Sequence, residues 1–119
     1  MSETDVPSAQ LRITYGPRKG DIIPLPQTGL VIGRAHSADL TINHGNLSRK
    51  HTRIAYEDGR WTLIDLDSTN HTFLNDEQLK PNAPYPLKHG DRIQLSNVVM
   101  VEFEESLFIA KSTHTARAS

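Results

Sequence analysis

Short apolar runs separated by turn residues recur along nearly the whole chain, and this pattern limits the folds that it can adopt. Leu11, Ile13 and Tyr15 alternate with polar residues, which is the period of a half-buried strand. Similar runs follow at residues 21–25, 30–32, 40–42, 51–56, 61–66, 72–74, 78–79, 92–95 and 98–104. No amphipathic helix of ordinary length lies between them. The sequence therefore predicts an all-β fold, an antiparallel sandwich or barrel of about ten short strands.

The connections between the runs contain specific turn signals. Residues 16–20 begin and end with glycine and join the first two runs, which predicts a hairpin. Asp58-Gly59, between the runs at 51–56 and 61–66, predicts a second hairpin, because this dipeptide favours the tight turns that match strand twist. Residues 80–86 contain three prolines and are expected to form an irregular connection.

Alternation along the runs also nominates the side chains of the core. Trp61 is assigned to this core rather than to a ligand site, because it lies in a strand beside a tight hairpin. The full set of expected inward-facing residues is Leu11, Ile13, Ile23, Val31, Leu40, Ile42, Ile54, Trp61, Leu63, Ile64, Phe73, Ile93, Leu95, Val99, Val101 and Phe103.

A length of 119 residues is that of one domain, large enough to bury a core. Residues 1–9 are polar and are expected to be a disordered leader, residues 10–106 to form the domain, and residues 107–119 to form a short helical turn and a flexible tail. The start lacks the features of a signal peptide, and no apolar stretch approaches the roughly 18 residues of a membrane helix. We therefore expect a cytoplasmic protein that does not contact a membrane.

Composition argues against several classes of function. The chain contains no cysteine, which excludes disulfides, thiolate catalysis and cysteine-based zinc sites. Its six histidines are scattered without a tight metal-ligand spacing, so neither a metal nor another cofactor is expected. A formal net charge of −1 gives no reason to expect nucleic acid as a partner.

Three polar clusters follow apolar runs, and each therefore falls at a strand end or in a loop. The first is Gly33-Arg34, the second runs from Leu47 to His51, and the third from Asp65 to Asn75. The Arg34 guanidinium presents a planar fork that matches phosphate or carboxylate oxygens, although it could equally be a surface arginine or a partner of a nearby aspartate. In the second cluster, a serine hydroxyl and successive backbone N–H groups can form an anion-binding concavity. Arg49, Lys50 and Arg53 raise the local positive potential there, although a solvated basic loop is the plainer interpretation.

His51 and the amides of the third cluster each allow two interpretations. His51 could be a base for Ser48, but a half-buried histidine that ties one loop to another is favoured, and no strand–elbow–helix context supports a hydrolase. Asn70 carries both a donor and an acceptor, so it could hydrogen-bond a passing peptide backbone or serve only its own turn. Asn75 allows the same two interpretations.

The order Gly-Arg, then Ser-Arg-x-His, then Ser-Thr-Asn-x-Thr-Phe-x-Asn closely resembles the signature of the forkhead-associated (FHA) family of phosphothreonine-binding domains, and the resemblance covers about residues 10–105. It implies a two-sheet β-sandwich of about ten to eleven short strands, with the ligand-binding loops at one end. It also implies roles for single residues. Arg34, Ser48 and Thr69 would contact the phosphate, Arg49 and Asn70 would hold the peptide backbone, and Gly33 and His51 would be structural supports.

One position departs from the family pattern. The glycine that usually follows the asparagine is replaced by His71. Glycine at this place would suit a positive φ, a region in which histidine is uncommon. Either the loop is reshaped, or His71 points toward the ligand and adds a pH-sensitive contact.

The resemblance implies a signalling adaptor rather than an enzyme, whose partner is a phosphothreonine-containing protein, either a substrate of a Ser/Thr kinase or the kinase itself. The alternative is a phosphate-independent scaffold or oligomerisation module on the same fold, with His71 marking the loss of phosphate binding. Thr4, Thr113 and Thr115 lie in the segments expected to be flexible, so self-association through a phosphorylated tail is a further hypothesis.

Overall fold

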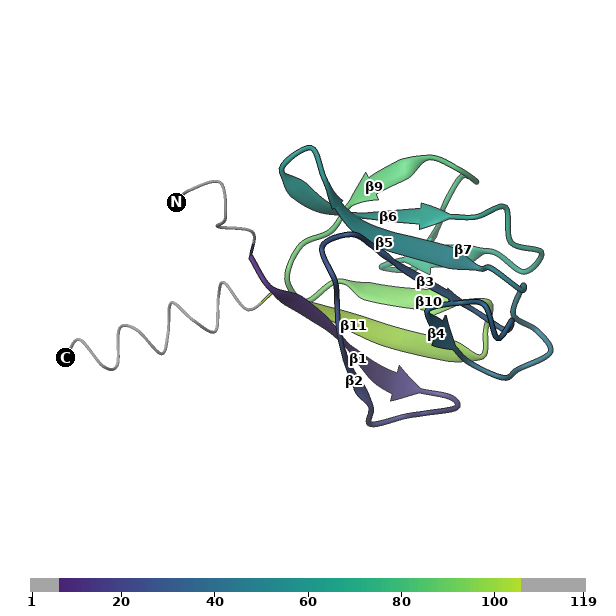
Figure 1. Ribbon diagram of the computed structural model, residues 1–119. Helices are drawn as coiled ribbons and strands as arrows, with labels where there is room; N and C mark the ends of the chain where they lie inside the picture. The colour runs from purple at the N-terminus through teal and green to yellow at the C-terminus, as the bar shows by residue number, and fades with distance from the viewer. Residues whose placement is uncertain (1–6, 106–119) are drawn as a thin grey trace.

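The computed structural model describes residues 7–105, which form two stacked β-sheets (Figure 1). The strands are β1 (Ala9–Tyr15), β2 (Ile22–Pro24), β3 (Leu30–Gly33), β4 (Leu40–Thr41), β5 (Thr52–Glu57), β6 (Arg60–Asp65), β7 (Thr72–Leu74), β8 (Glu77–Gln78), β9 (Pro84–Pro86), β10 (Arg92–Leu95) and β11 (Val99–Glu105). Within the described part of the chain, no helix is long and apolar enough to cross a membrane. The predicted all-β sandwich is confirmed.

One sheet has the strand order β2-β1-β11-β10-β7-β8 and the other β4-β3-β5-β6-β9. Both predicted hairpins form, since β1 pairs with β2 and β5 with β6, each in antiparallel register. Among the named strands of residues 7–105, β3 and β4 alone pair in parallel, with Ile32 opposite Leu40. The sandwich is therefore antiparallel apart from this short contact at the edge of its sheet and an isolated parallel bridge between Asp65 and Pro81.

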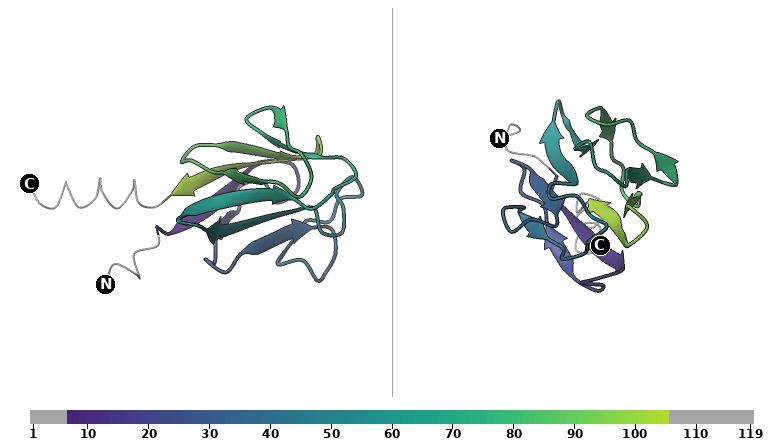
Figure 2. Two further views of the ribbon diagram at one scale, coloured as in Figure 1. Left: turned by 90° about the horizontal axis from the view of Figure 1, so that it is seen from above. Right: turned by 90° about the vertical axis from the view of Figure 1, so that its right-hand side faces the viewer.

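The strand order gives the molecule two distinct ends. The first residue of β1 lies opposite the last of β11, Ala9 against Glu105, so the described chain begins and ends at the same place. We call this the terminal end, which also holds the β5–β6 turn and residues 87–91. The connections at 34–39, 42–51, 66–71 and 96–98 lie at the opposite end, here called the loop end, on the right of Figure 1. Figure 2 shows the same separation from above.

The core agrees with the predicted alternation, with three exceptions. Trp61 is 1% exposed and packs edge-on against Tyr56, with ring centroids 5.4 Å apart, which confirms its assignment to the core. Val31, Ile64 and Phe73 are only partly buried and lie outside the core cluster, so their assignment was wrong, whereas Ile23 is partly buried but packs against the core as predicted. Val31 and Ile64 lie in continuous apolar runs, Leu30-Val31-Ile32 and Leu63-Ile64. Because successive side chains of a strand point to opposite faces, Val31 and Ile64 face outward.

Several buried side chains come from connections rather than strands, and alternation could not have found them. Leu25, Leu47, Leu79 and Leu87 are each at most 8% exposed. Leu47 matters most for function, because it anchors the long 42–51 connection under the loop end. A buried leucine between exposed neighbours holds such a segment in one place.

Two expectations for individual segments differ from the structure. Ala9 is buried in β1, and the Pro7 carbonyl accepts a hydrogen bond of 2.9 Å from Trp61 Nε1, so the part of the expected leader at residues 7–9 belongs to the domain. The segment expected to be irregular contains β9, which tolerates prolines because it is an edge strand that pairs only with β6. Residues 1–6, and the helical turn and tail expected at 107–119, lie outside the described residues.

Candidate functional site

The first and second polar clusters meet through their backbones at the end of β3. Arg34 N donates to the Ser48 carbonyl at 2.9 Å, and Ala35 N donates to the Arg49 carbonyl at 3.1 Å. A Cβ on Gly33 would lie 2.1 Å from the Arg49 carbonyl oxygen, far inside van der Waals contact. Gly33 is therefore required by the close approach of the second loop, which fixes the position of Ser48 relative to Arg34.

Arg34 is held at its Nε and open at the fork. Its Nε donates to the Leu47 carbonyl at 2.9 Å, while its Nη groups have no partner within residues 7–105. The two aspartates that could have neutralised it are engaged elsewhere. Asp39 accepts from Val31 N at 2.8 Å, and Asp65 is fully buried. The guanidinium therefore presents free donors to solvent in a fixed direction.

His51 connects the two loops from a completely buried position. Its Nδ1 accepts from the backbone N–H of Ser48 at 3.1 Å, and its Nε2 lies 2.9 Å from the His71 carbonyl. Because a backbone N–H can only donate, Nδ1 must be unprotonated, and Nε2 then carries the hydrogen that bonds the carbonyl. Burial lowers the pKa of His51, partly offset by its hydrogen bond to His71. A neutral imidazole thus holds both loops.

The same geometry argues against Ser48 and His51 as a nucleophile and its base. His51 bonds the backbone of Ser48 and not its hydroxyl, whereas a serine nucleophile needs the imidazole within reach of its oxygen. The Ser48 Oγ instead accepts from Thr69 N at 2.9 Å. No group of histidine and acidic residues suited to hold a metal ion occurs within residues 7–105.

Asp65 organises the third cluster from beneath. Its carboxylate accepts from the Ser68 hydroxyl, from Ser68 N at 3.1 Å and from the Thr72 hydroxyl at 2.6 Å. The bonds to Ser68 hold the middle of the 66–71 connection and the bond to Thr72 spans it, so this carboxylate sets its shape. Sequence reasoning did not assign a role to Asp65, although a carboxylate three residues before a serine is a recognised turn signal.

Hydrogen bonds join the loops to one another and leave several of their polar groups without a partner in the described part of the chain. Thr69 N reaches the Ser48 Oγ, and Asn70 Nδ2 donates to the Asn46 carbonyl at 3.0 Å. The hydrogen of the Ser48 hydroxyl and the Thr69 hydroxyl have no partner in the described part of the chain, and neither does Asn70 Oδ1. Asn46 was missed as a contributor, because a backbone carbonyl gives no signal in the sequence.

The electrostatics of the loop end differ from those of the whole chain. Arg34, Arg49 and Lys50 are exposed and form no ion pair within residues 7–105. Arg53, expected to add to this potential, instead pairs with Glu57 at 3.0 Å on the outer face of the sheet. Three unpaired cations beside unpaired hydroxyls and an amide suit a dianion attached to a peptide.

His71 has φ of 70°, in the left-handed region that glycine would occupy without strain. Its carbonyl accepts from His51 Nε2 and, at 2.9 Å, from Ser96 N. The loop therefore keeps the backbone conformation that a glycine would allow, and it does so with a histidine whose ring is exposed.

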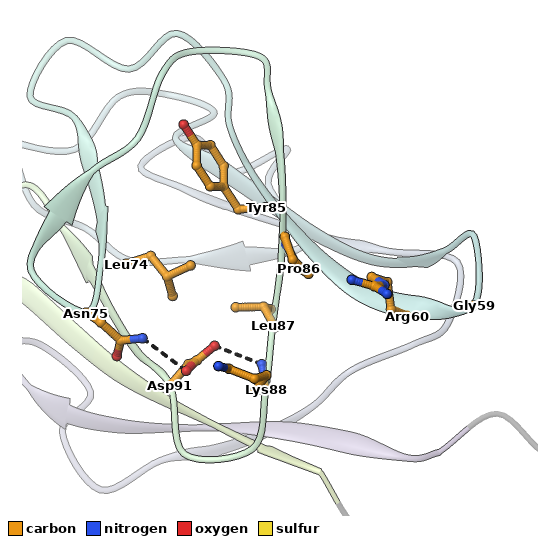
Figure 3. Close-up of a pocket in the computed structure, with 9 residues that line it drawn as sticks. All are labelled: Gly59, Arg60, Leu74, Asn75, Tyr85, Pro86, Leu87, Lys88 and Asp91. Atoms are coloured by element: carbon orange, nitrogen blue, oxygen red, sulfur yellow. Dashed lines mark hydrogen bonds between the residues drawn. The ribbon is translucent and has the colours of Figure 1, made fainter.

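A hollow of about 600 Å³ lies at the terminal end and is lined by none of the predicted site residues except Asn75 (Figure 3). There Asn75 Nδ2 donates to Asp91 at 3.0 Å, and Asn75 Oδ1 accepts from Arg92 N at 2.9 Å. Both ends of this amide are used within the protein, so Asn75 ties the β7–β8 turn to the start of β10 and fits neither of its two predicted roles. The structure brings Gly33, Arg34, Ser48, Arg49, His51, Thr69, Asn70 and His71 together at the loop end.

Comparison with known proteins gives a consistent result. A family model described as FHA domain matches residues 30–96, more than half of the chain. An FHA domain-containing protein of Arabidopsis thaliana is 32% identical over 94% of the chain, which spans only 31% of that relative's length. A solved FHA domain of an Arabidopsis thaliana hypothetical protein has a TM-score of 0.78 and 32% identity, covering 84% of this chain and 86% of the other.

A second solved structure comes from work on phosphothreonine-dependent FHA domain interactions. It has a TM-score of 0.71 and 26% identity, and it covers 82% of this chain and 95% of the other. The family model spans all three polar clusters, and the neighbours share the two-sheet sandwich. The chain therefore belongs to the FHA domain family.

Proposed function

We propose that this FHA domain binds phosphothreonine in a partner protein and so mediates a phosphorylation-dependent interaction. The observation that carries the proposal is the convergence of unused donors at Ser48. The Arg34 fork, the Ser48 hydroxyl and the Thr69 hydroxyl come from three separate connections that hydrogen bonds hold together. The domain would bind its ligand without catalysing a reaction.

Each residue would act through the group that the fold leaves free. Arg34 would donate two parallel N–H groups to phosphate oxygens, with single bonds from Ser48 and Thr69. Asn70, held by Asn46 at one amide hydrogen, would bond the peptide backbone through its oxygen. The exposed Arg49 would hold the peptide beside the phosphate, while Gly33 and His51 would support the loops without touching the ligand.

Simple magnitudes place the affinity in the micromolar range. A phosphothreonine carries about −1.5 to −2 charges near neutral pH and three acceptor oxygens. Hydrogen bonds to charged groups contribute roughly 1.5–3 kcal/mol each, and association costs several kcal/mol. Four bonds at the upper end of this range, about 12 kcal/mol together, leave about 8 kcal/mol after an association cost of about 4 kcal/mol, which corresponds to a Kd near 1 μM.

Fluorescence anisotropy with a degenerate phosphothreonine peptide library and its unphosphorylated twin tests the proposal. Wild type should bind only the phosphorylated library. Arg34→Ala should weaken binding by about 10- to 150-fold, which corresponds to the loss of one hydrogen bond to a charged group. Arg60→Ala is the matched control, because Arg60 is an exposed arginine at the terminal end that lines the larger hollow. Equal binding by wild type and Arg34→Ala would refute the role of Arg34.

Free phosphothreonine and added salt provide an independent check, because both should compete only with phosphate-dependent binding. If folded wild type binds neither library, a phosphate-independent scaffold becomes the better explanation of the same fold.

The partner would be a protein phosphorylated by a Ser/Thr kinase, or such a kinase itself, and the interaction would take place in the cytoplasm. A second copy of this chain phosphorylated at Thr4, Thr113 or Thr115 is one candidate, although these residues lie outside the described part of the structure. A kinase-treated sample that remained monomeric in native mass spectrometry would exclude this form of self-association.

A further inference from the structure

A second hollow, of about 350 Å³, adjoins the proposed peptide site at the loop end. It shares Asn46 and Asn70 with that site, and these two residues are joined by the hydrogen bond from Asn70 Nδ2 to the Asn46 carbonyl. Its remaining lining comes from His71, from the 96–98 connection and from one face of β7 and β10. A peptide held by Asn70 would therefore pass directly into it.

Phe73 and Gln94 form one wall of this hollow. They are cross-strand partners on β7 and β10, and both are half-buried on the outer face of their sheet. Gln94 Nε2 donates to the Ser96 carbonyl at 3.0 Å, which holds the amide beside the ring. This wall offers an apolar ring and an amide, and it carries no charge.

His71 is the single titratable residue among those that line the hollow. The other lining residues, from the 42–51 and 66–71 connections, β7, β10 and the 96–98 connection, carry no charged group. Neither ring nitrogen of His71 has a hydrogen-bond partner within residues 7–105. The His71 carbonyl is fixed by His51 and Ser96, and φ is 70°, so the backbone holds the exposed ring at this position.

We propose that His71 makes this hollow a specificity site for an acidic side chain that follows the phosphothreonine in the ligand. The inference rests on the proposed function. A carboxylate can accept from the imidazole N–H and from the amides around it, while the methylenes of a glutamate can lie against Phe73. An aliphatic side chain would instead desolvate the imidazole and the amides without giving them partners, which is unfavourable.

Peptides that differ at one downstream position test this directly. Each carries one phosphothreonine, with glutamate, glutamine or leucine placed in turn at each of the following positions. Wild type should prefer glutamate over glutamine at one position by about two- to five-fold, the range of an exposed contact to a charged group. The ratio cancels the contribution of the phosphate, which both peptides share.

His71→Asn should abolish the glutamate preference, because asparagine tolerates a positive φ but lacks the imidazole. His36→Asn is the matched control, since His36 is also exposed at the loop end but does not line the hollow, and this variant should keep the preference. A ratio that is unchanged in His71→Asn, or a preference for leucine, would overturn the inference.

The outcomes also separate this inference from the proposed function. Phosphate-dependent binding that is lost in Arg34→Ala, together with an equal Kd for the glutamate and glutamine peptides, would overturn the role of His71 alone. Absence of phosphate-dependent binding to every peptide would overturn both.

Discussion

The two ends of the sandwich both carry a hollow, an asparagine and a buried aspartate, yet only the loop end has the properties of a binding site. At the terminal end, Asn75 bonds Asp91 and Arg92 N, and Asp91 also accepts from Lys88 N at 2.8 Å (Figure 3). At the loop end, the buried side chains of Asp65 and His51 are likewise hydrogen-bonded within the protein. The Arg34 fork and the hydrogen of the Ser48 hydroxyl have no such partner within residues 7–105.

The difference lies in where free hydrogen-bonding capacity remains, and not in volume. The larger hollow belongs to the terminal end, where the polar side chains of Asn75 and Asp91 are already satisfied. At the loop end, a supporting layer of Gly33, His51 and Asp65 holds the loops in place. Above it lies an exposed layer with unused hydrogen-bonding groups, which consists of Arg34, Ser48, Thr69 and Asn70. If this distinction is correct, substitutions in the supporting layer should reduce stability and binding together, whereas equivalent changes at the terminal end should reduce stability alone.

Replacing Gly33 should have the largest effect. In Gly33→Ala the new Cβ meets the Arg49 backbone at 2.1 Å, so β3 and the second loop must separate, at an expected cost of about 3 kcal/mol or more. Urea unfolding and phosphopeptide anisotropy should both show the loss. Gly59→Ala is the control at the terminal end. Its Cβ would meet nothing, but its φ of 81° should cost about 1 kcal/mol and leave Kd unchanged. A stable Gly33→Ala protein with normal affinity would contradict the required close approach.

The paired variants Asp65→Asn and Asp91→Asn compare the two ends more closely. Each replaces a buried carboxylate by an amide that can no longer accept every bond, with an expected loss of about 1–3 kcal/mol in unfolding free energy. Asp65→Asn should also weaken phosphopeptide binding, because it releases Ser68 and Thr72 and with them the 66–71 connection.

Asp91→Asn should leave the Kd of the folded protein unchanged, since its partners Asn75 and Lys88 lie at the other end. Titration calorimetry at a temperature where both variants are folded measures the difference. Equal effects of the two variants on Kd would mean that binding depends on overall stability and not on local support.

The sequence predicted the exposed layer and, in the supporting layer, Gly33 and His51, but it did not predict Asp65. Arg34, Ser48 and Asn70 were identified because their residue types and order carry a recognisable chemistry, and the alternation of Leu11 and Ile13 was enough to predict strands. Asp65 and Asn46 were not identified, because their roles depend on which backbone groups a loop turns toward them. That information arises only when connections distant in the chain meet. The position of Asn75 was likewise ambiguous until the strand order placed it at the terminal end.

The smallest expected effect is a pH dependence of the unfolding free energy. It should distinguish two histidines whose Nδ1 each accepts a hydrogen bond from a backbone N–H. His51 Nδ1 accepts from Ser48 N at the loop end, and His89 Nδ1 accepts from Glu105 N at the terminal end, both near 3.0 Å. His51 is fully buried, and burial lowers its pKa below the ordinary 6.5. Below about pH 6.5 the unfolded chain therefore binds a proton at this residue more readily than the folded protein does.

The unfolding free energy should accordingly be constant with respect to His51 above this pH and should fall below it, by at most about 1.4 kcal/mol per pH unit for one proton. His51→Gln should remove that part of the slope, while His89→Gln leaves the burial of His51 intact and should retain it. Measurement above pH 5 avoids the separate loss from Glu104, whose pKa is lowered from 4.5 by its bonds to Gln10 and Arg12 and which therefore weakens the fold only in more acidic solution. Amide exchange locates the effect. A protonated His51 can no longer accept from Ser48 N. As the pH is lowered, the protection factor of the Ser48 amide should therefore decrease before that of the Ile54 amide in the adjoining strand. Equal changes at both amides would show that the protein opens as a whole and that His51 does not couple protonation to the loop that presents Ser48.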